Sequence, residues 1–280
     1  MKNNKKKVIF IGGLSNGKKV VEYLLSQKNV KLDLVFTHKK KKNIPRYSSF
    51  FSLKKKIKIF KTDNVNDYYL KIKEYKPDII IVAGWSNIIE EKILEIPKFG
   101  VVGFHPSNLP KDRGRSVLAW QIEEGYKKTA LSMFYYTKKA DAGDIIGKHL
   151  ICIKKTDYIN DVLDKVDLAT LKLLNKYFKK LFSPNIKKTK QNNGKATYRK
   201  LRTLSNQLIN WNESGEKIIN KIRAISKPYP GAIGRINGKK FKIWQAKKLS
   251  YKIKGKYFKN FLIANCKNCS IMLQKYEIIK

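Results

Sequence analysis

The hexapeptide DIIIVA at residues 78–83 decides the fold, because it is almost wholly apolar and is followed at once by Gly84. An apolar run of this length, bounded by turn residues, is typical of a strand buried on both faces, as strands are in parallel sheets. A similar run at residues 8–12 precedes a glycine-rich turn and a segment with apolar residues at helical spacing, residues 18–27. The pattern therefore predicts an α/β domain built on a parallel sheet.

Further strands and helices are expected on both sides of this run. The strands are expected at residues 32–37, 57–60, 101–104, 131–136 and 145–153, and the helices at 63–75, 116–124 and 157–182, with one more between the turn at 84–87 and residues 97–100. Residues 183–197 are polar and contain a proline and a glycine, which predicts a linker. After it, a helix at 214–226 and strands at 232–236, 240–244 and 261–273 are expected. We therefore expect a Rossmann-like domain at 1–182 and a small C-terminal β-rich domain at 198–280, as suits a chain of 280 residues.

The composition excludes several classes of protein. Hydrophobic residues make up 42% of the chain, yet no apolar run approaches the roughly 20 residues of a membrane-spanning helix. The basic N-terminus precedes an apolar run, residues 8–11, that is too short for the core of a signal peptide. Three cysteines cannot form a disulfide framework, in agreement with a reducing compartment. We expect a cytoplasmic protein that does not engage a membrane.

The formal charge of +41 would ordinarily indicate a polyanionic partner such as nucleic acid. Only seven of the 62 basic residues are arginines, and the lysines are spread along the whole chain. This distribution favours a lysine-rich, solvated surface over a binding stripe. The charge still attracts anionic ligands at low salt, including sugar nucleotides and tRNA.

Two polar residues stand next to strand-like runs in turn-rich surroundings. His105 ends one run within GFHPSNLP, residues 103–110, and Asp141 lies 36 residues later within ADAGDII, residues 140–146. An imidazole with an orienting carboxylate can take a proton from an amine or stabilise charge that develops during acyl transfer. The spacing therefore predicts a paired acid-base site.

Two other motifs have a structural interpretation. The turn GGLSNGKK, residues 12–19, nearly matches a phosphate-binding loop, but it ends in lysine where a hydroxyl would bind magnesium. We interpret it as an ordinary strand-to-helix turn. Cys266 and Cys269 form a lone C-x-x-C, which a hairpin turn between two strands explains better than a zinc or redox site. His38 and His149 are interpreted as surface or internally satisfied histidines.

The residues around His105 resemble the formyltransferases that use N10-formyltetrahydrofolate. The matching motifs are PKFG at 97–100, HPSNLP at 105–110, RG at 113–114, W-x-I-x-x-G at 120–125, D-x-G-D-I at 141–145, Tyr198, Arg202, Trp211, IRA at 222–224 and PYPGA at 228–232. The order and spacing of these motifs extend the resemblance over most of the chain.

The resemblance implies transfer of a formyl group from the folate to a primary amine on a Rossmann-like N-terminal domain, without a metal. By that similarity His105 would act at the reacting carbon or as base toward the amine, and Asp141 would orient it. The folate would lie against residues 84–89 and 136–144. The residues expected to bind it are Gly84, Trp85, Ser86, Ile88, Tyr136 and Asp144.

One position departs from the family pattern. The family usually has an asparagine two residues before the histidine, whose amide helps to hold the formyl oxygen, and this chain has Gly103. Loss of one such donor typically costs about 2.7 to 4 kcal/mol of transition-state stabilisation. Asn108 or a backbone amide would have to replace the donor, which makes Asn108 the third catalytic candidate. The alternative is a catalytically weakened homologue that binds folate or sugar.

The acceptor is predicted from the remainder of the chain. The C-terminal β region, residues 227–280, is shorter than the corresponding domain expected of methionyl-tRNA formyltransferases, which favours a small acceptor, an amino-sugar nucleotide. Transfer to methionyl-tRNA is the alternative, and salt-sensitive tRNA binding would favour it. A homodimer remains open.

Overall fold

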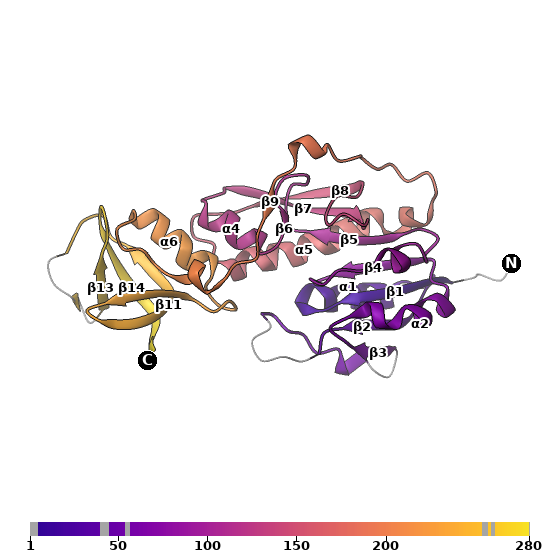
Figure 1. The fold of residues 1–280 in the computed structure, drawn as a ribbon, viewed down its shortest axis with the longest axis horizontal. Coiled ribbons are helices and arrows are strands. Elements are labelled where there is room, and N and C mark those ends of the chain that lie inside the picture. Colours follow the sequence, from indigo (N-terminus) through magenta and orange to yellow (C-terminus); the bar gives the residue numbers. More distant parts are fainter. Residues whose placement is uncertain (1–4, 40–44, 54–56, 254–256, 259–260, 280) are drawn as a thin grey trace. The chain divides into compact units, whose positions relative to one another are not determined.

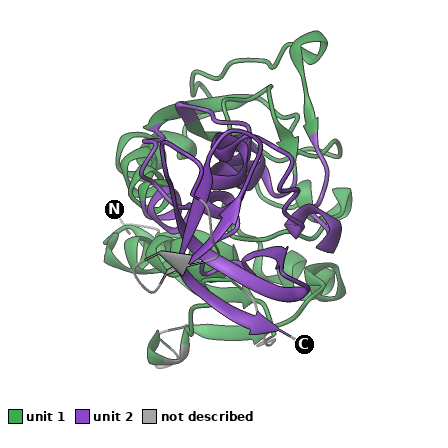
Figure 2. Ribbon diagram, turned by 90° about the vertical axis from the view of Figure 1, so that its left-hand side faces the viewer, with its two compact units in different colours: residues 1–114, 130–151, 165–198 green, residues 115–129, 152–164, 199–280 purple. Residues whose placement is uncertain are grey.

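The computed structural model describes residues 5–39, 45–53, 57–253, 257–258 and 261–279. The chain divides into two compact units (Figure 2). The first comprises residues 1–114, 130–151 and 165–198, and the second comprises residues 115–129, 152–164 and 199–280. Each unit is assembled from segments that are distant in the sequence.

The first unit is organised around a seven-stranded sheet with the order β3-β2-β1-β4-β5-β7-β8 (Figure 1). Its strands are β1 (Lys6–Gly12), β2 (Val30–Thr37), β3 (Lys58–Lys61), β4 (Ile79–Ala83), β5 (Val101–His105), β7 (Lys128–Tyr135) and β8 (Ile145–Cys152). The pairs among β1 to β5 are parallel, and β7 joins β5 antiparallel. The predicted α/β class is confirmed, with a mixed sheet in place of a wholly parallel one.

The central strands are buried because both faces of the sheet are covered. Every residue of β4 is buried, as its continuous apolar sequence predicts. The helices are α1 (Leu14–Ser26), α2 (Tyr69–Tyr75), α3 (Glu91–Leu94), α4 (Val117–Glu123), α5 (Ile159–Tyr177) and α6 (Gly215–Ala224). Helix α5 continues as a 3-10 turn, Phe178–Phe182, and its buried apolar residues recur at helical spacing, as predicted.

The expected helix after the turn at 84–87 is much shorter than its sequence suggests. Only α3 is helical there. The amide of Glu90, before α3, donates to the side chain of Asn66, and Pro97 follows three residues after α3 ends. A helix ends at or before the residue that precedes a proline, since that residue is pushed toward extended backbone.

Strand order reverses between β1 and β4, and the turns that leave these two strands lie against each other. Gly84 has φ +65°, and a Cβ on it would lie 2.4 Å from the carbonyl oxygen of Gly13. Only glycine fits this approach without strain. In open α/β sheets, ligands bind outside the carboxyl ends of the strands at such a reversal. The fold therefore marks the region beside Gly84 as a candidate ligand site.

The second unit contains a five-stranded antiparallel sheet with the order β10-β11-β14-β13-β12. The strands are β10 (Ala232–Ile236), β11 (Lys239–Lys248), β12 (Tyr257–Phe258), β13 (Phe261–Asn265) and β14 (Ser270–Ile279). The predicted C-terminal β-rich region is confirmed. Cys266 and Cys269 lie in the β13–β14 turn, with their sulfur atoms 3.4 Å apart, so the hairpin interpretation of this motif is confirmed. Burial and the neighbouring thiol raise the pKa of Cys269 to about 11.

Candidate active site

His105 is the last residue of β5, where it lies opposite Ser132 of β7. It is only 6% exposed, and its Nε2 lies 2.7 Å from the carbonyl oxygen of Asp112. The turn after β5 is held by two hydroxyl groups. Ser132 donates to the carbonyl of Ser107, and Ser107 donates to the carbonyl of Lys111, both at 2.7 Å. The imidazole therefore has a fixed orientation.

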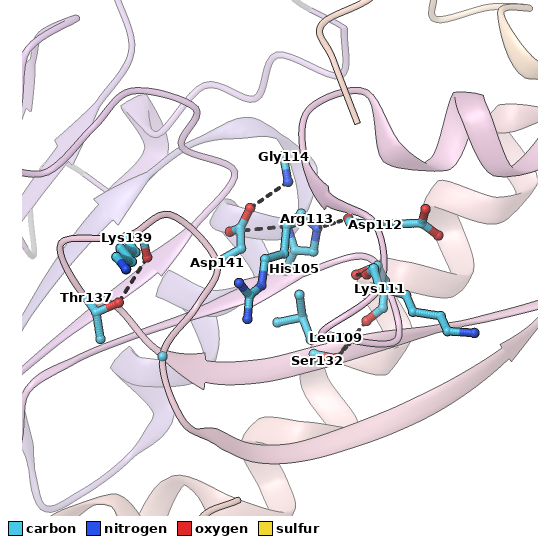
Figure 3. Close-up of polar contacts among 12 residues, drawn as sticks. His105, Leu109, Lys111, Asp112, Arg113, Gly114, Ser132, Thr137, Lys139 and Asp141 are labelled. Atoms are coloured by element: carbon cyan, nitrogen blue, oxygen red, sulfur yellow. Dashed lines mark hydrogen bonds and ion pairs between the residues drawn. The ribbon is translucent and has the colours of Figure 1, made fainter. Parts of the chain in front are cut away.

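Asp141 reaches the same place from the turn between β7 and β8 (Figure 3). Its Oδ1 lies 3.4 Å from Nδ1 of His105, and its Oδ2 accepts a hydrogen bond of 2.8 Å from the amide of Gly114. The Thr137 hydroxyl tightens this turn by donating to the carbonyl of Lys139. Asp141 itself has φ +55°, a left-handed conformation that aspartate tolerates better than most residues. The two side chains that the sequence pairs are thus brought together.

The contacts of His105 determine which ring nitrogen can exchange a proton. A carbonyl oxygen can only accept a hydrogen bond, so Nε2 carries a proton toward Asp112. The nitrogen with variable protonation is therefore Nδ1, and it faces the Asp141 carboxylate. A carboxylate in this position stabilises the imidazolium that forms when Nδ1 takes up a proton.

A buried hydrogen-bond network holds the backbone at Asp141 in place. Arg113, 2% exposed, donates from Nε and Nη2 to Oε1 of Gln191 at 3.2 and 2.7 Å, and from Nη2 to Asn193. Gln191 in turn donates to the carbonyl oxygens of Asp141 and Gly143 at 2.9 and 2.7 Å. Gln191 was not predicted as a site residue, because it lies in the polar segment, residues 183–197, that was predicted to be a linker. No local pattern marks it, since its role depends on partners about 50 residues away.

Asn108, the third catalytic candidate, is placed differently. Its side chain is exposed, and its amide oxygen accepts a hydrogen bond of 2.7 Å from Lys148 Nζ. The same ammonium group donates to the carbonyl of Leu109. Burial of this amine lowers the pKa of Lys148. Within the described chain, Asn108 makes no hydrogen bond to His105 or Asp141, so the structure offers no support for it as the replacement donor.

Two aromatic side chains lie in the region beside Gly84. Trp85 is 9% exposed and stacks on the ring of His38, with centroids 4.5 Å apart and planes 12° apart. His38 is fixed by a 2.9 Å contact of Nε2 with the carbonyl of Gly84, in agreement with an internally satisfied histidine. The indole Nε1 of Trp85 is buried without a hydrogen-bond partner in the described part of the protein. Buried indole N–H groups usually have a partner, so the unpaired state of this one is unusual.

The other residues expected to bind folate lie at two places. Ser86 and Ile88 follow Trp85 on the surface, and the side chain of Ile88 is largely exposed, at 79%. Asp144 pairs with Lys188, at 3.2 Å, before β8 begins. Tyr136 follows β7, is half-buried and stacks on Phe134. Burial and the charge of Asp141 raise its pKa above the ordinary tyrosine value.

The described residues contain neither a metal-binding cluster nor a membrane-spanning helix. No three histidine, cysteine, aspartate or glutamate side chains among them gather in a way that could hold a metal ion. None of the helices that the structure describes is long and apolar enough to cross a membrane.

Comparisons with known proteins agree with this architecture. The methionyl-tRNA formyltransferase of Bacillus velezensis is 36% identical over 182 residues, which are 65% of this chain and 57% of that protein. The match thus spans little more than half the length of that relative.

Two solved structures share the fold. An N-formyltransferase from Helicobacter canadensis, in complex with folinic acid and dTDP-3-aminofucose, superimposes with a TM-score of 0.73 at 20% identity, covering 96% of this chain and 99% of that one. Methionyl-tRNA formyltransferase from Clostridium thermocellum gives 0.67 at 22% identity, covering 98% and 99%.

The family is established by sequence models that cover most of the chain. The formyl transferase model matches residues 5–176, which include Gly84, His105 and Asp141. The model of the formyl transferase C-terminal domain matches residues 203–278. Since the first model alone covers more than half of the sequence, the chain belongs to the formyl transferase family.

Proposed function

We propose that the protein transfers a formyl group from N10-formyltetrahydrofolate to a primary amine. The observation that carries the proposal is the contact between His105 Nδ1 and Asp141 Oδ1 at the end of β5. It supplies a proton acceptor with an orienting carboxylate in a buried setting, which is what an attacking amine requires.

The proton has a defined route in this geometry. The amine nitrogen bonds to the formyl carbon, the bond from that carbon to N10 of the donor breaks, and the amine loses a proton. His105 Nδ1 takes up this proton while Nε2 remains bonded to Asp112. Asp141, held by the amide of Gly114, stabilises the imidazolium until the proton passes to the departing nitrogen.

The folate donor supplies the formyl carbon when it is bound, and we assign its binding to the region beside Gly84. Trp85 offers a buried N–H without a partner, and Ile88 offers exposed apolar surface. Ligand pockets combine apolar lining with a few placed polar groups in this way. We assign Gly84, Trp85, Ser86 and Ile88 to one side of the donor site. Tyr136 and Asp144 are assigned to the side nearer His105.

The acceptor that we favour is an amino-sugar nucleotide. The N-formyltransferase from Helicobacter canadensis shares the fold and was solved in complex with dTDP-3-aminofucose, which supports a small acceptor for this chain. Methionyl-tRNA is the second candidate. The formal charge of +41 and the methionyl-tRNA formyltransferase of Bacillus velezensis favour it.

Length does not separate the two candidates. The Clostridium thermocellum methionyl-tRNA formyltransferase is also covered almost completely by this chain. The comparison therefore weakens the inference that a short C-terminal region favours a small acceptor.

A mass-spectrometric transfer assay tests the proposal. The purified protein is incubated with N10-formyltetrahydrofolate and, separately, with a panel of amino-sugar nucleotides or charged initiator tRNA. We expect one amino-sugar nucleotide to gain the mass of one CO unit. Gain on tRNA alone, with binding that weakens steeply as salt rises, would establish the second candidate. No gain on any amine would refute formyl transfer to this panel.

A further inference from the structure

The pairing of β5 with β7 aligns an unusual set of residues on one face of the sheet. Gly103 lies opposite Phe134, and His105 lies opposite Ser132. Alternate residues of a strand share a face, so Gly103 and His105 face the same side as Phe134. Tyr136 continues this row, because its amide donates to the carbonyl of Val101 at 2.8 Å, one step past the end of β7. It is the diagonal neighbour of Gly103.

The ring of Tyr136 occupies the space that a side chain at position 103 would need. A Cβ built on Gly103 would lie 2.2 Å from Cε2 of Tyr136 and 3.0 Å from Cζ. The ring is fixed on its other side by stacking on Phe134, with centroids 5.3 Å apart and planes 19° apart. It also packs against two groups of buried apolar residues. Gly103 therefore admits a phenol ring that the surrounding packing holds in one place.

The hydroxyl of Tyr136 is left available by this packing. It has no hydrogen-bond partner among the described residues, and it is not one of the fully buried polar atoms, so it is open to solvent. Burial and the negative charge of Asp141 both raise its pKa, so the hydroxyl keeps its proton at neutral pH and can donate. An unpaired donor near the acid-base pair invites a ligand oxygen.

Other donors nearby are already committed. Nε2 of His105 donates to Asp112, and the amide of Gly114 donates to Asp141. Asn108 is exposed, and its amide oxygen accepts from Lys148, a contact that turns this side chain toward Lys148.

We propose that Tyr136 is a catalytic residue whose hydroxyl donates a hydrogen bond to the formyl oxygen as negative charge develops there. The inference rests on the proposed function and adds the group that stabilises the oxyanion. No proton is transferred from Tyr136, since the amine proton goes to His105. A single preorganised donor of this kind is worth roughly 10²- to 10³-fold in rate.

Removal of the hydroxyl alone is the first test. We expect Tyr136→Phe to lower kcat by roughly 10² to 10³ while leaving KM and Tm close to the wild-type values, because the ring still stacks on Phe134. Tyr135→Phe is the matched control, since it makes the same chemical change one residue away on the opposite face of the strand. Equal rates for Tyr136→Phe and the wild type would overturn the proposal.

A second readout needs no turnover. In protein labelled with ¹³C at tyrosine Cζ, the resonance absent from Tyr136→Phe belongs to Tyr136. We expect it to shift when a stable N10-formylfolate analogue binds and to respond much less to the same analogue without its formyl group. Identical responses would overturn the proposal. A wild type that shows the selective shift but transfers no formyl group would refute the proposed function and still support the hydrogen bond.

The placement of the ring is tested by a double-mutant cycle. Gly103→Ala should destabilise the wild type, because the new methyl group meets the Tyr136 ring, and should have little effect in a Tyr136→Ala background. An equal loss of stability in both backgrounds would show that the ring does not fill this space, and the proposal would fall.

Discussion

The carboxyl ends of β5 and β4 lie in the same sheet but are built in opposite ways. At the end of β5, His105 and Asp141 have fixed partners on both sides, and Gln191 satisfies the buried Arg113 beneath them. At the end of β4, Trp85 has a buried N–H without a partner and is followed by exposed apolar surface. The first end is fully hydrogen-bonded within the described protein, whereas the second leaves a polar group unpaired. The difference agrees with the proposal that the first end performs chemistry and the second binds the donor.

The largest effect is expected when the charge at the end of β5 is removed. Asp141→Asn keeps an oxygen for the amide of Gly114 and suits the left-handed backbone, but it no longer stabilises the imidazolium of His105. We expect the transfer rate to fall by roughly 10² to 10⁴. The measurement is kcat for formyl transfer, with Tm as the control for folding. A rate within a few-fold of the wild type, at unchanged Tm, would contradict the assigned role.

A smaller effect, on stability, is expected from the support beneath the pair. Gln191→Ala deprives the buried guanidinium of Arg113 of two hydrogen bonds and frees two backbone carbonyls. We expect the free energy of unfolding to drop by about 2 to 4 kcal/mol, measured in urea. Lys190→Ala, at the exposed neighbouring position, is the control and should change it by no more than about 0.5 kcal/mol. Equal stabilities for the two variants would contradict the hydrogen bonds of Gln191 to Arg113 and to the two carbonyls.

At the end of β4, the main effect of a substitution is expected on the affinity for folate. Trp85→Phe removes an unpaired donor and part of a ring that packs in the core, so we expect a moderate fall in Tm. Affinity for tetrahydrofolate should weaken by about twofold to tenfold, the worth of one net hydrogen bond, in calorimetric titrations. Unchanged affinity would remove the indole from the donor site and leave it a packing role only.

The smallest effect is expected at Asn108. Because its amide is exposed and bonded to Lys148, Asn108→Ala should change the transfer rate by no more than about twofold, as a surface substitution does. A loss of a hundredfold would instead identify Asn108 as the oxyanion donor and remove the need for Tyr136.

Much of the fold was predictable because the signals are local. The apolar run of β4 predicts a buried strand, and the periodicity of residues 159–177 predicts an amphipathic helix. The structure confirms both. The expected helix after residue 87 was wrong in length, since a few apolar residues near Pro97 cannot outweigh the constraint of the proline. The antiparallel orientation of β7 relative to β5 could not be predicted either. Strand direction depends on the path of the chain between the strands and not on the strand's own residues.

The sequence alone determined that His105 and Asp141 belong to one site, because both stand next to apolar strands within motifs at a characteristic spacing. It also determined the family and the order of the two sheets. Only the tertiary structure decided which neighbours the pair has. Gln191 reaches Asp141 across 50 residues, and Tyr136 meets Gly103 only through the register of two antiparallel strands. Such contacts depend on how strands align and loops close, and no local pattern of residue types encodes that alignment.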